Sequence, residues 1–274
     1  MYVYDNLIVP LLQRMVNLEE LNLFLIIIRV DLNYVDGIQL YDDILIHMPR
    51  LNKFAFNIDT SIIMNNPEII LSSNEDIQRS FARNEYGPVH SDIEIYTREK
   101  KNRHGHPART SIFNSRCHIY SLPYQFDPLL FSGNSFESGM FNTVRYLLVT
   151  DIGPFEYTFF KSISQNFPVL KELHVLNYRV QLERQPSTTS ITFPHLIVLG
   201  LVHSSPDYAK QFLVDERCHL PSLRDLIICY HWLLYVTKNF TNDATRLTCS
   251  RVTNLHTKEP YIPPENFHEY FPLL

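Results

Sequence analysis

Glycine is scarce in this sequence, which contains 7 glycines among 274 residues, against 17 prolines. Cofactor- and phosphate-binding loops of the GxGxxG and GxxxxGK(S/T) types require closely spaced glycines, and neither pattern occurs. The net charge is −5, so the chain lacks the excess basic surface with which a general nucleic-acid binder neutralises phosphates. We therefore expect no cofactor and no nucleic-acid partner.

Paired cysteines and long apolar runs are also missing. The 4 cysteines show no CxxC spacing, which favours free thiols in a reducing compartment. The longest apolar run, Leu23 to Ile28, is too short to cross a bilayer. Asp5 comes early and the first basic residue, Arg14, follows the first apolar stretch, which does not fit a signal peptide. The sequence therefore predicts a cytoplasmic or nuclear protein with no membrane partner.

What the sequence does contain is a nine-residue phrase that recurs at nearly constant spacing. Four copies follow one another at intervals of 26, 26 and 27 residues, and such an interval indicates a repeat architecture. The copies are FNTVRYLLV from Phe141, FPVLKELHV from Phe167, FPHLIVLGL from Phe193 and LPSLRDLII from Leu220, with weaker copies from Met15, Met48 and Cys249.

Each phrase ends in alternating apolar residues, such as Leu173 and Val175, which predict a strand with one buried face. Between phrases the apolar residues follow a helical period, as in Phe155, Phe159 and Ile163 after Pro154. Stacked units of one strand and one helix predict an α/β solenoid with a parallel sheet. Similar helical stripes are Ile38, Tyr41, Ile44, Leu45 and Met48; Tyr208, Phe212 and Leu213; and Trp232, Leu233, Val236 and Phe240.

The phrase resembles the LxxLxL pattern of leucine-rich repeats in the long form with helices on the convex side. This resemblance implies a leucine-rich-repeat-like solenoid with parallel strands on the concave face and helices on the convex face. The usual Asn or Cys three positions after the last leucine is replaced by Tyr178, Ser204 and His231. We therefore expect irregular repeats that lack the usual side-chain ladder between neighbouring loops.

We predict a single domain over residues 1–274. It comprises N-terminal repeats over 1–56, an irregular section over 57–140, and regular repeats with a C-terminal cap over 141–274. The open ends of such a solenoid must be covered. The helix before Met15 and the segment from Tyr261 to Leu274 are the expected caps.

The irregular section contains a predicted helix and two predicted strands. Ser72 and Glu75 form a capping-box pattern at the start of the helix. Asp92–Tyr96 and Cys117–Leu122 both alternate like strands. The link between them has no helical stripe, so we prefer an antiparallel hairpin with a long loop to two further parallel repeats with one helix lost.

Two clusters in this section resemble binding sites only superficially. The spacing of His104, His106, Cys117 and His118 does not match the paired short spacings of structural zinc sites, so we expect exposed loop histidines and no metal. The segment Glu99–Arg109 has four basic residues against one acid. No aromatic residues interleave with them for base stacking, and we expect a solvated loop.

No arrangement of residues points to catalysis. The sequence lacks a nucleophile-elbow pattern such as GxSxG, and the acidic pair Asp42–Asp43 is predicted to point outward from a helix. We therefore expect no enzymatic activity. A hydrolase would need a pocket that the sequence does not indicate.

The candidate site is the concave face of the predicted sheet. In each phrase the leucines point inward, so the residues between them point outward, and these are more apolar than a solvated face requires. Because exposed apolar surface marks partner sites, we predict a protein-binding face in preference to a face covered by a neighbouring segment or the C-terminal tail. Its residues are Tyr146, Leu148, Thr150, Glu172, His174, Leu176, Val198, Val202, Asp225 and Ile227, with Gly200 and Cys229 in the same rows.

Four longer blocks resemble F-box/leucine-rich-repeat proteins. In that family, a helical F-box binds the adaptor subunit of a cullin-RING ubiquitin ligase and the repeats hold the target protein. Because a repeat phrase already begins at Met15, no F-box is expected in this chain, and an adaptor is a partner only if an F-box lies upstream. The blocks are GIQLYDDILIHMPRLNKFAFNI (Gly37–Ile58), SNEDIQRSF (Ser73–Phe81), CHIYSLPYQFD (Cys117–Asp127) and VRYLLVTDIGPFEYTFF (Val144–Phe160).

Pattern and resemblance together predict a protein-interaction module. Its expected role is substrate recognition for an F-box-type ubiquitin ligase, with a target protein held on the concave face. The alternative is a free-standing leucine-rich-repeat scaffold or inhibitor with no link to a ligase.

Overall fold

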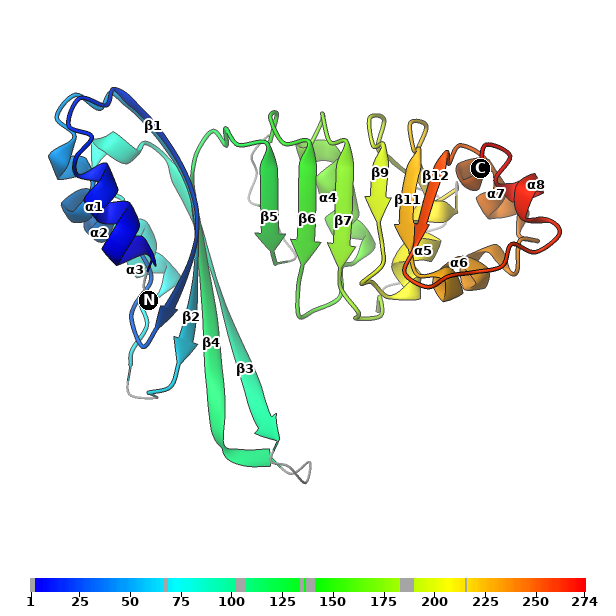
Figure 1. The fold of residues 1–274 in the computed structure, drawn as a ribbon, viewed down its shortest axis with the longest axis horizontal. Coiled ribbons are helices and arrows are strands. Elements are labelled where there is room, and N and C mark those ends of the chain that lie inside the picture. Colours follow the sequence, from blue (N-terminus) through cyan, green and yellow to red (C-terminus); the bar gives the residue numbers. More distant parts are fainter. Residues whose placement is uncertain are drawn as a thin grey trace. The chain divides into compact units, whose positions relative to one another are not determined.

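The computed structural model describes residues 3–66, 69–101, 107–133, 136, 141–182, 190–214 and 216–274, with the backbone alone for 96–101 and 107–114. The chain has a mixed α/β fold with parallel strand pairing in its sheets (Figure 1). It divides into two compact units, an N-terminal unit (Met1–Gln125) and a C-terminal unit (Phe126–Leu274). Within the described residues, no helix is long and apolar enough to cross a membrane.

The N-terminal unit is built on a four-stranded sheet in the order β1-β2-β4-β3. β1 and β2 are parallel, whereas β4 is antiparallel to both β2 and β3. The helical elements α1, α2 and α3 lie on one side of this sheet (Figure 1). The elements are η1 (Tyr4–Ile8), α1 (Val9–Leu12), β1 (Glu20–Val30), α2 (Gly37–Asp43), η2 (Leu45–His47), β2 (Lys53–Met64), α3 (Asn74–Ser80), η3 (Asn84–Tyr86), β3 (Val89–Lys101) and β4 (Pro107–Ser121).

The two weaker phrases of the N-terminal unit form the parallel pair β1 and β2. Leu21 pairs with Phe54 and Leu23 with Phe56, so the two copies lie in phase. One buried cluster joins these side chains to Leu40 of α2 and to neighbouring helical residues. The predicted stripe that starts at Ile38 is wrong at its first position, because Ile38 is 61% exposed and Leu40 is buried.

The predicted antiparallel hairpin is confirmed, and two further parallel repeats are not found there. β3 and β4 pair from Val89–Ser121 to Lys101–Pro107. The long loop expected between them was wrong, since both ends of the segment Glu99–Arg109 are strand. Pairing with a neighbouring strand therefore overrides the low strand propensity of these charged residues. Residues 102–106, including His104 and His106, lie outside the described residues.

The helix cap predicted at Ser72 lies one residue further along the chain. Ser73 is the N-cap of α3 and forms a complete capping box with Asp76. Ser72 instead accepts a hydrogen bond from Asn33 Nδ2 at 2.9 Å. The pairs Ser72–Glu75 and Ser73–Asp76 both have the spacing of a capping box. Because Ser72 is hydrogen-bonded to Asn33, Ser73 is the residue that caps the helix.

Gly37 lies where the start of α2 meets the end of α3. Its amide donates to Ser80 Oγ at 2.8 Å, and a Cβ here would lie 2.7 Å from the Ser80 carbonyl carbon. Because the obstacle is backbone, we expect Gly37→Ala to lower the free energy of unfolding by about 1–3 kcal/mol. Urea denaturation beside Ile38→Ala, an exposed control on the same helix, measures the effect. Equal stability of Gly37→Ala and wild type would show that α2 and α3 can move apart without cost to make room for the methyl group.

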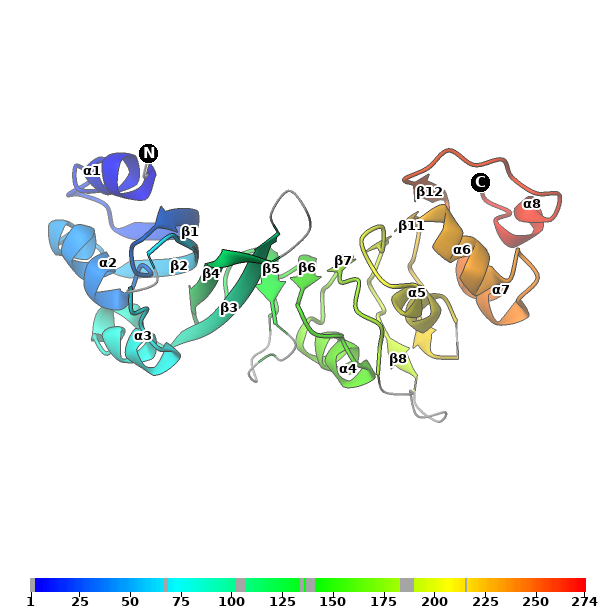
Figure 2. The ribbon, with the colours of Figure 1, turned by 90° about the horizontal axis from the view of Figure 1, so that it is seen from below.

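The C-terminal unit contains a six-stranded sheet in the order β12-β11-β9-β7-β6-β5, with every neighbouring pair parallel. The helices α4, α5 and α6 lie on one side of it (Figure 2). The elements are β5 (Pro128–Ser132), β6 (Tyr146–Thr150), α4 (Tyr157–Asn166), β7 (Glu172–Leu176), β8 (Ile191–Thr192), β9 (Val198–Gly200), α5 (Pro206–Leu213), β10 (Cys218–His219), β11 (Asp225–Ile228), α6 (Tyr230–Thr237), α7 (Asp243–Cys249), β12 (Asn254–Thr257) and α8 (Phe267–Tyr270).

The strands of the sheet place the recurrent phrases in phase. Leu147, Leu173, Leu199 and Leu226 lie side by side in register, and all four are fully buried. The strand predictions from the four regular phrases and from the copy at Cys249 are therefore confirmed. β5, whose Leu129 pairs with Leu147, was not predicted from the sequence.

One side chain joins the loops that follow β6 and β7, where no such link was expected. Asn177, which is 2% exposed, donates from Nδ2 to the Gly153 carbonyl at 2.6 Å. Asn177 lies two positions after Val175, the last apolar residue of its phrase. The leucine-rich-repeat pattern places its Asn or Cys three positions after that residue, where Tyr178 stands, so Asn177 was not predicted. Ser204 is also buried, but its hydrogen bond to the Leu201 carbonyl at 2.8 Å stays within its own loop.

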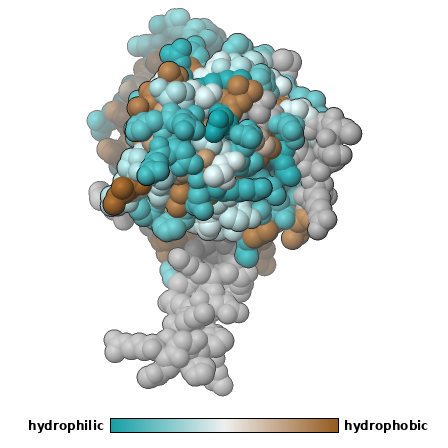
Figure 3. Space-filling view, turned by 90° about the vertical axis from the view of Figure 1, so that its right-hand side faces the viewer, coloured by the Kyte–Doolittle hydropathy of each residue, from teal (hydrophilic) through white to brown (hydrophobic). Residues whose placement is uncertain are grey.

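The C-terminal segment packs against the helices of its unit. Phe240, which follows α6, forms edge contacts with Phe267, Tyr270 and Phe271 at 5.4–6.1 Å between ring centroids. These three aromatic residues are almost fully buried, as expected for a cap. The C-terminal end of the unit, which faces the viewer in Figure 3, is mainly hydrophilic with separate hydrophobic spots.

Candidate functional site

Nine of the ten residues predicted for the concave face lie on β6, β7, β9 and β11, at strand positions that alternate with buried core residues. The helices α4, α5 and α6 lie on one side of these strands (Figure 2). All ten are half-buried, and along β6 and β7 they alternate strictly with fully buried residues. Val202 differs from the rest because β9 ends at Gly200, so Val202 lies in the following turn. We call this set of ten residues the open face.

The strand register groups the open face into rows across the sheet. One row contains Tyr146, Glu172, Val198 and Asp225, which are neighbours from β6 to β11. Asp225 accepts a hydrogen bond at 2.8 Å from Asn254 of β12. The row therefore mixes one aromatic and one aliphatic residue with two carboxylates.

The centre of the open face is a cluster of three polar side chains. His174 Nε2 lies 2.7 Å from Glu172 Oε1, and its ring lies 5.3 Å from the Tyr146 ring between centroids. The imidazole occupies the space above Gly200, where a Cβ would collide with it. The absence of a side chain at Gly200 thus allows His174 to lie flat across the neighbouring strand.

The electrostatics of this cluster keep the Tyr146 hydroxyl protonated. Partial burial and, second, the Glu172 carboxylate raise the Tyr146 pKa above its ordinary value. A protonated phenol can donate and accept hydrogen bonds while its ring offers apolar surface. The cluster therefore offers hydrogen-bonding groups and one aromatic ring, and no nucleophile is paired with a base in it.

Apolar side chains flank the polar cluster. Leu148 is the neighbour of His174 across β6 and β7, and Ile227 pairs with Gly200 across β11 and β9. Leu176 lies at the end of β7, paired with Thr150. Aromatic, aliphatic and polar side chains are found together in this way at many protein interfaces.

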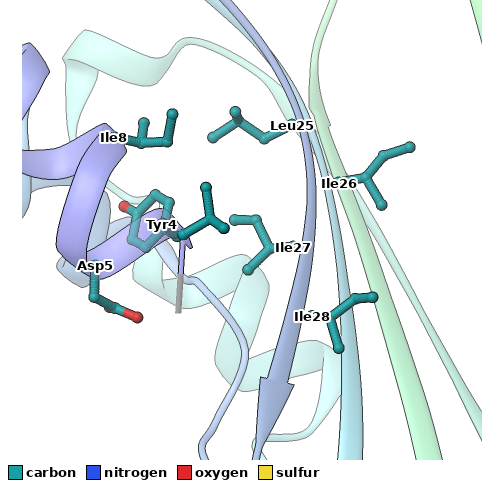
Figure 4. Close-up of a pocket in the computed structure, with 8 residues that line it drawn as sticks. Tyr4, Asp5, Ile8, Leu25, Ile26, Ile27 and Ile28 are labelled. Carbon is teal, nitrogen blue, oxygen red and sulfur yellow. The ribbon is translucent and has the colours of Figure 1, made fainter. Parts of the chain in front are cut away.

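A pocket of about 310 Å³ lies in the N-terminal unit between the first helix and β1 (Figure 4). Tyr4 and Ile8 project from the helix toward Leu25 and Ile27, whereas Ile26 points to the other side of the strand. Its lining carboxylate, Asp5, is paired with Arg29 at 3.2 Å. The pocket is therefore mainly apolar, and its lining contains no nucleophile–base pair.

A polar network on the N-terminal sheet was not predicted from the sequence. Arg116 of β4 makes a bidentate ion pair with Asp59 of β2 and lies 4.0 Å from Glu94 of β3. On the same strand, His118 Nε2 lies 2.7 Å from Asn57 Oδ1, and Asn57 Nδ2 donates to Tyr124 at 2.6 Å. No sequence motif marks this network, because strand pairing assembles it.

The remaining sequence candidates do not assemble into a site in the described part of the chain. Cys117 and His118 are neighbours in a strand, so their side chains point to opposite faces. Burial raises the Cys117 pKa and lowers the His118 pKa. Asp42 is exposed as predicted, whereas Asp43 is half-buried.

Comparisons with known proteins identify no relative. The scan against family models, the search of curated proteins and the search of solved structures each give no match. The resemblance to F-box/leucine-rich-repeat proteins therefore stays a prediction.

Proposed function

We propose that the C-terminal unit is a leucine-rich-repeat-like solenoid whose open face binds a protein partner. The observation that carries the proposal is the in-phase parallel stacking of the recurrent phrases, with helices on one side of the sheet and the half-buried open face on the other. A parallel sheet is normally covered on both faces. Covering the open face with a partner would complete the burial of its apolar residues.

The contacts of the open face favour recognition over chemistry. Tyr146 is the strongest candidate for a binding hot spot, because tyrosine is enriched at such positions and is already held by His174. Leu148, Leu176 and Ile227 would supply apolar contact around it. The Glu172 and Asp225 carboxylates favour a partner surface that presents basic or hydrogen-bond-donating groups there.

Through the family resemblance, the partner would be a protein presented for ubiquitination. The alternative, a scaffold or inhibitor with no ligase, predicts the same face but a different assembly. Affinity purification of the endogenous protein separates the two roles. Recovery of a cullin-RING adaptor subunit together with the face-dependent partner supports the ligase role, and recovery of the partner without the adaptor supports the scaffold.

The open face itself is tested with Leu176→Asp and Ile227→Asp. A photo-crosslinking amino acid at Leu148 should capture the partner in cells, whereas one at exposed Lys161 on α4 should not. We expect each aspartate variant to weaken binding of the purified partner by about 30-fold or more, because a desolvated, unpaired charge is placed in the interface. Titration calorimetry measures the affinity, with Lys161→Asp as the control.

Three results would contradict this proposal. Equal crosslinking from both positions would mean that the open face is not the binding surface. Unchanged affinity of both aspartate variants for the partner would also mean that the partner does not bind to the open face. A collapsed thermal transition in these variants would show that Leu176 and Ile227 belong to the core.

A further inference from the structure

A second group of chemically active side chains lies at one edge of the six-stranded sheet, beyond the open face. Cys229 follows β11 and is the N-cap residue of α6, His231 lies in the first turn of α6, and Glu259 follows β12. β11 and β12 are parallel neighbours, so the segments that leave their carboxyl ends emerge side by side. This pairing brings Glu259 to Cys229 across 30 residues of sequence.

The distances within this group fit coordination of one metal ion. Cys229 Sγ lies 3.7 and 3.6 Å from the two Glu259 carboxylate oxygens. Ligands at about 2.3 Å (sulfur) and 2.0 Å (oxygen) from a tetrahedral zinc ion are about 3.5 Å apart. The ligand atoms of all three residues lie within 4.8 Å of one another, and His231 is the exposed member of the group.

The surrounding contacts hold these ligands in place. Tyr230, between Cys229 and His231, stacks on Tyr261 with 4.6 Å between ring centroids and 21° between planes. The Thr257 hydroxyl donates to the Glu259 backbone carbonyl at 2.8 Å. The Tyr230–Tyr261 stack and the pairing of Ile228 with Thr257 therefore join the two chain segments, and the Thr257 hydroxyl fixes the turn that carries Glu259.

Solvent exposure favours an open coordination position. Cys229 and Glu259 are half-buried and His231 is exposed. Three protein ligands with a water as the fourth are typical of accessible zinc sites, whereas closed structural sites use four protein ligands. The mixture of thiolate, imidazole and carboxylate suits zinc-type ions, whereas magnesium and calcium prefer oxygen ligands alone.

We propose that Cys229, His231 and Glu259 bind one zinc-type divalent ion, with water at the fourth position. On binding, the Cys229 thiol releases its proton to solvent and the thiolate sulfur forms the metal bond. Without a metal ion, the same thiol donates a hydrogen bond to the Glu259 carboxylate. The bound ion would fix the segment after β12 to the start of α6. This proposal does not depend on the function of the open face.

Thiol labelling of the folded, metal-free protein provides the test. Cys117, Cys218 and Cys249 are at most 1% exposed, and burial raises the Cys249 pKa to about 12, so a thiol-reactive disulfide reagent should label Cys229 first. We expect Zn²⁺ to slow this labelling and Mg²⁺ to leave it unchanged. Co²⁺ should bind at one ion per chain with a thiolate charge-transfer absorption band, which Cys229→Ser should remove.

Ligand variants distinguish the three-residue site from a lone thiolate. His231→Gln and Glu259→Gln should each weaken Zn²⁺ protection by at least about 10-fold, and His195→Gln, an exposed histidine elsewhere in the unit, should not change it. Circular dichroism verifies that all variants are folded. Labelling that Zn²⁺ does not slow, or protection that persists unchanged in both ligand variants, would overturn the proposal.

Discussion

Val175→Asp is expected to unfold the C-terminal unit, whereas Leu176→Asp, at the next position of the same strand, is expected to leave it folded. Val175 is 0% exposed and points into the core, while Leu176 lies on the open face. An unpaired carboxylate in the core costs several kcal/mol, and the lost apolar burial adds roughly 1.5–3 kcal/mol. Their sum approaches the roughly 5–15 kcal/mol that stabilises a typical domain.

The single tryptophan makes this comparison specific to one unit. Trp232 lies in α6 of the C-terminal unit, so its fluorescence during urea denaturation follows that unit alone. We expect no folded baseline for Val175→Asp. The midpoint for Leu176→Asp should stay close to that of wild type, since substitutions away from the core usually change stability by about 0.5 kcal/mol or less. Similar behaviour of the two variants would show that the sheet does not have one buried and one open face here.

The strands were predictable because each phrase combines two local signals. Apolar residues at every second position define the buried side, and the fixed interval identifies the copies. Both signals are present in the phrase that contains Leu173 and Val175. These two buried residues alternate with half-buried residues along β7, as predicted. The same pattern is present in Phe126, just before β5, and in Leu129 and Phe131 of β5. That copy was missed because it lies 18 residues before Val144 and Leu147 instead of 26.

Features that depend on pairing between distant segments could not be predicted. The division of the chain after Gln125 follows from packing, and no change in composition marks it. The Arg116–Asp59 ion pair and the Cys229–Glu259 contact join residues that are far apart in sequence. Each arises from the strand order, which the phrase alone does not specify. Whether the two units act as one repeat domain stays a prediction.

Acid should destabilise the N-terminal unit through His118. Burial, and second the nearby Arg116 guanidinium, lower the His118 pKa from 6.5 to about 3 in the folded chain. Above pH 6.5 the imidazole is neutral in both the folded and the unfolded state, so the stabilisation is fully present. Below pH 6.5 the unfolded chain binds a proton that the folded chain does not, and the free energy of unfolding falls by up to about 1.4 kcal/mol per pH unit.

The surroundings of His118 set the size of this effect. Its cross-strand neighbours are Asp59 and Asp92, but the Asp59 charge is compensated by the bidentate contact with Arg116. The Nε2–H group donates to Asn57 Oδ1 at 2.7 Å, which satisfies the neutral ring.

Urea denaturation between pH 7.5 and pH 4.5 measures this loss, with circular dichroism for both units and Trp232 fluorescence for the C-terminal unit alone. His118→Gln retains a donor for Asn57 and cannot titrate, so its stability should depend much less on pH than that of wild type. His195→Gln, an exposed histidine in the other unit, should retain the wild-type dependence. An equally steep acid loss in His118→Gln would assign the effect to other groups, whereas a flat profile would identify the buried imidazole as the group that limits the stability of the N-terminal sheet in acid.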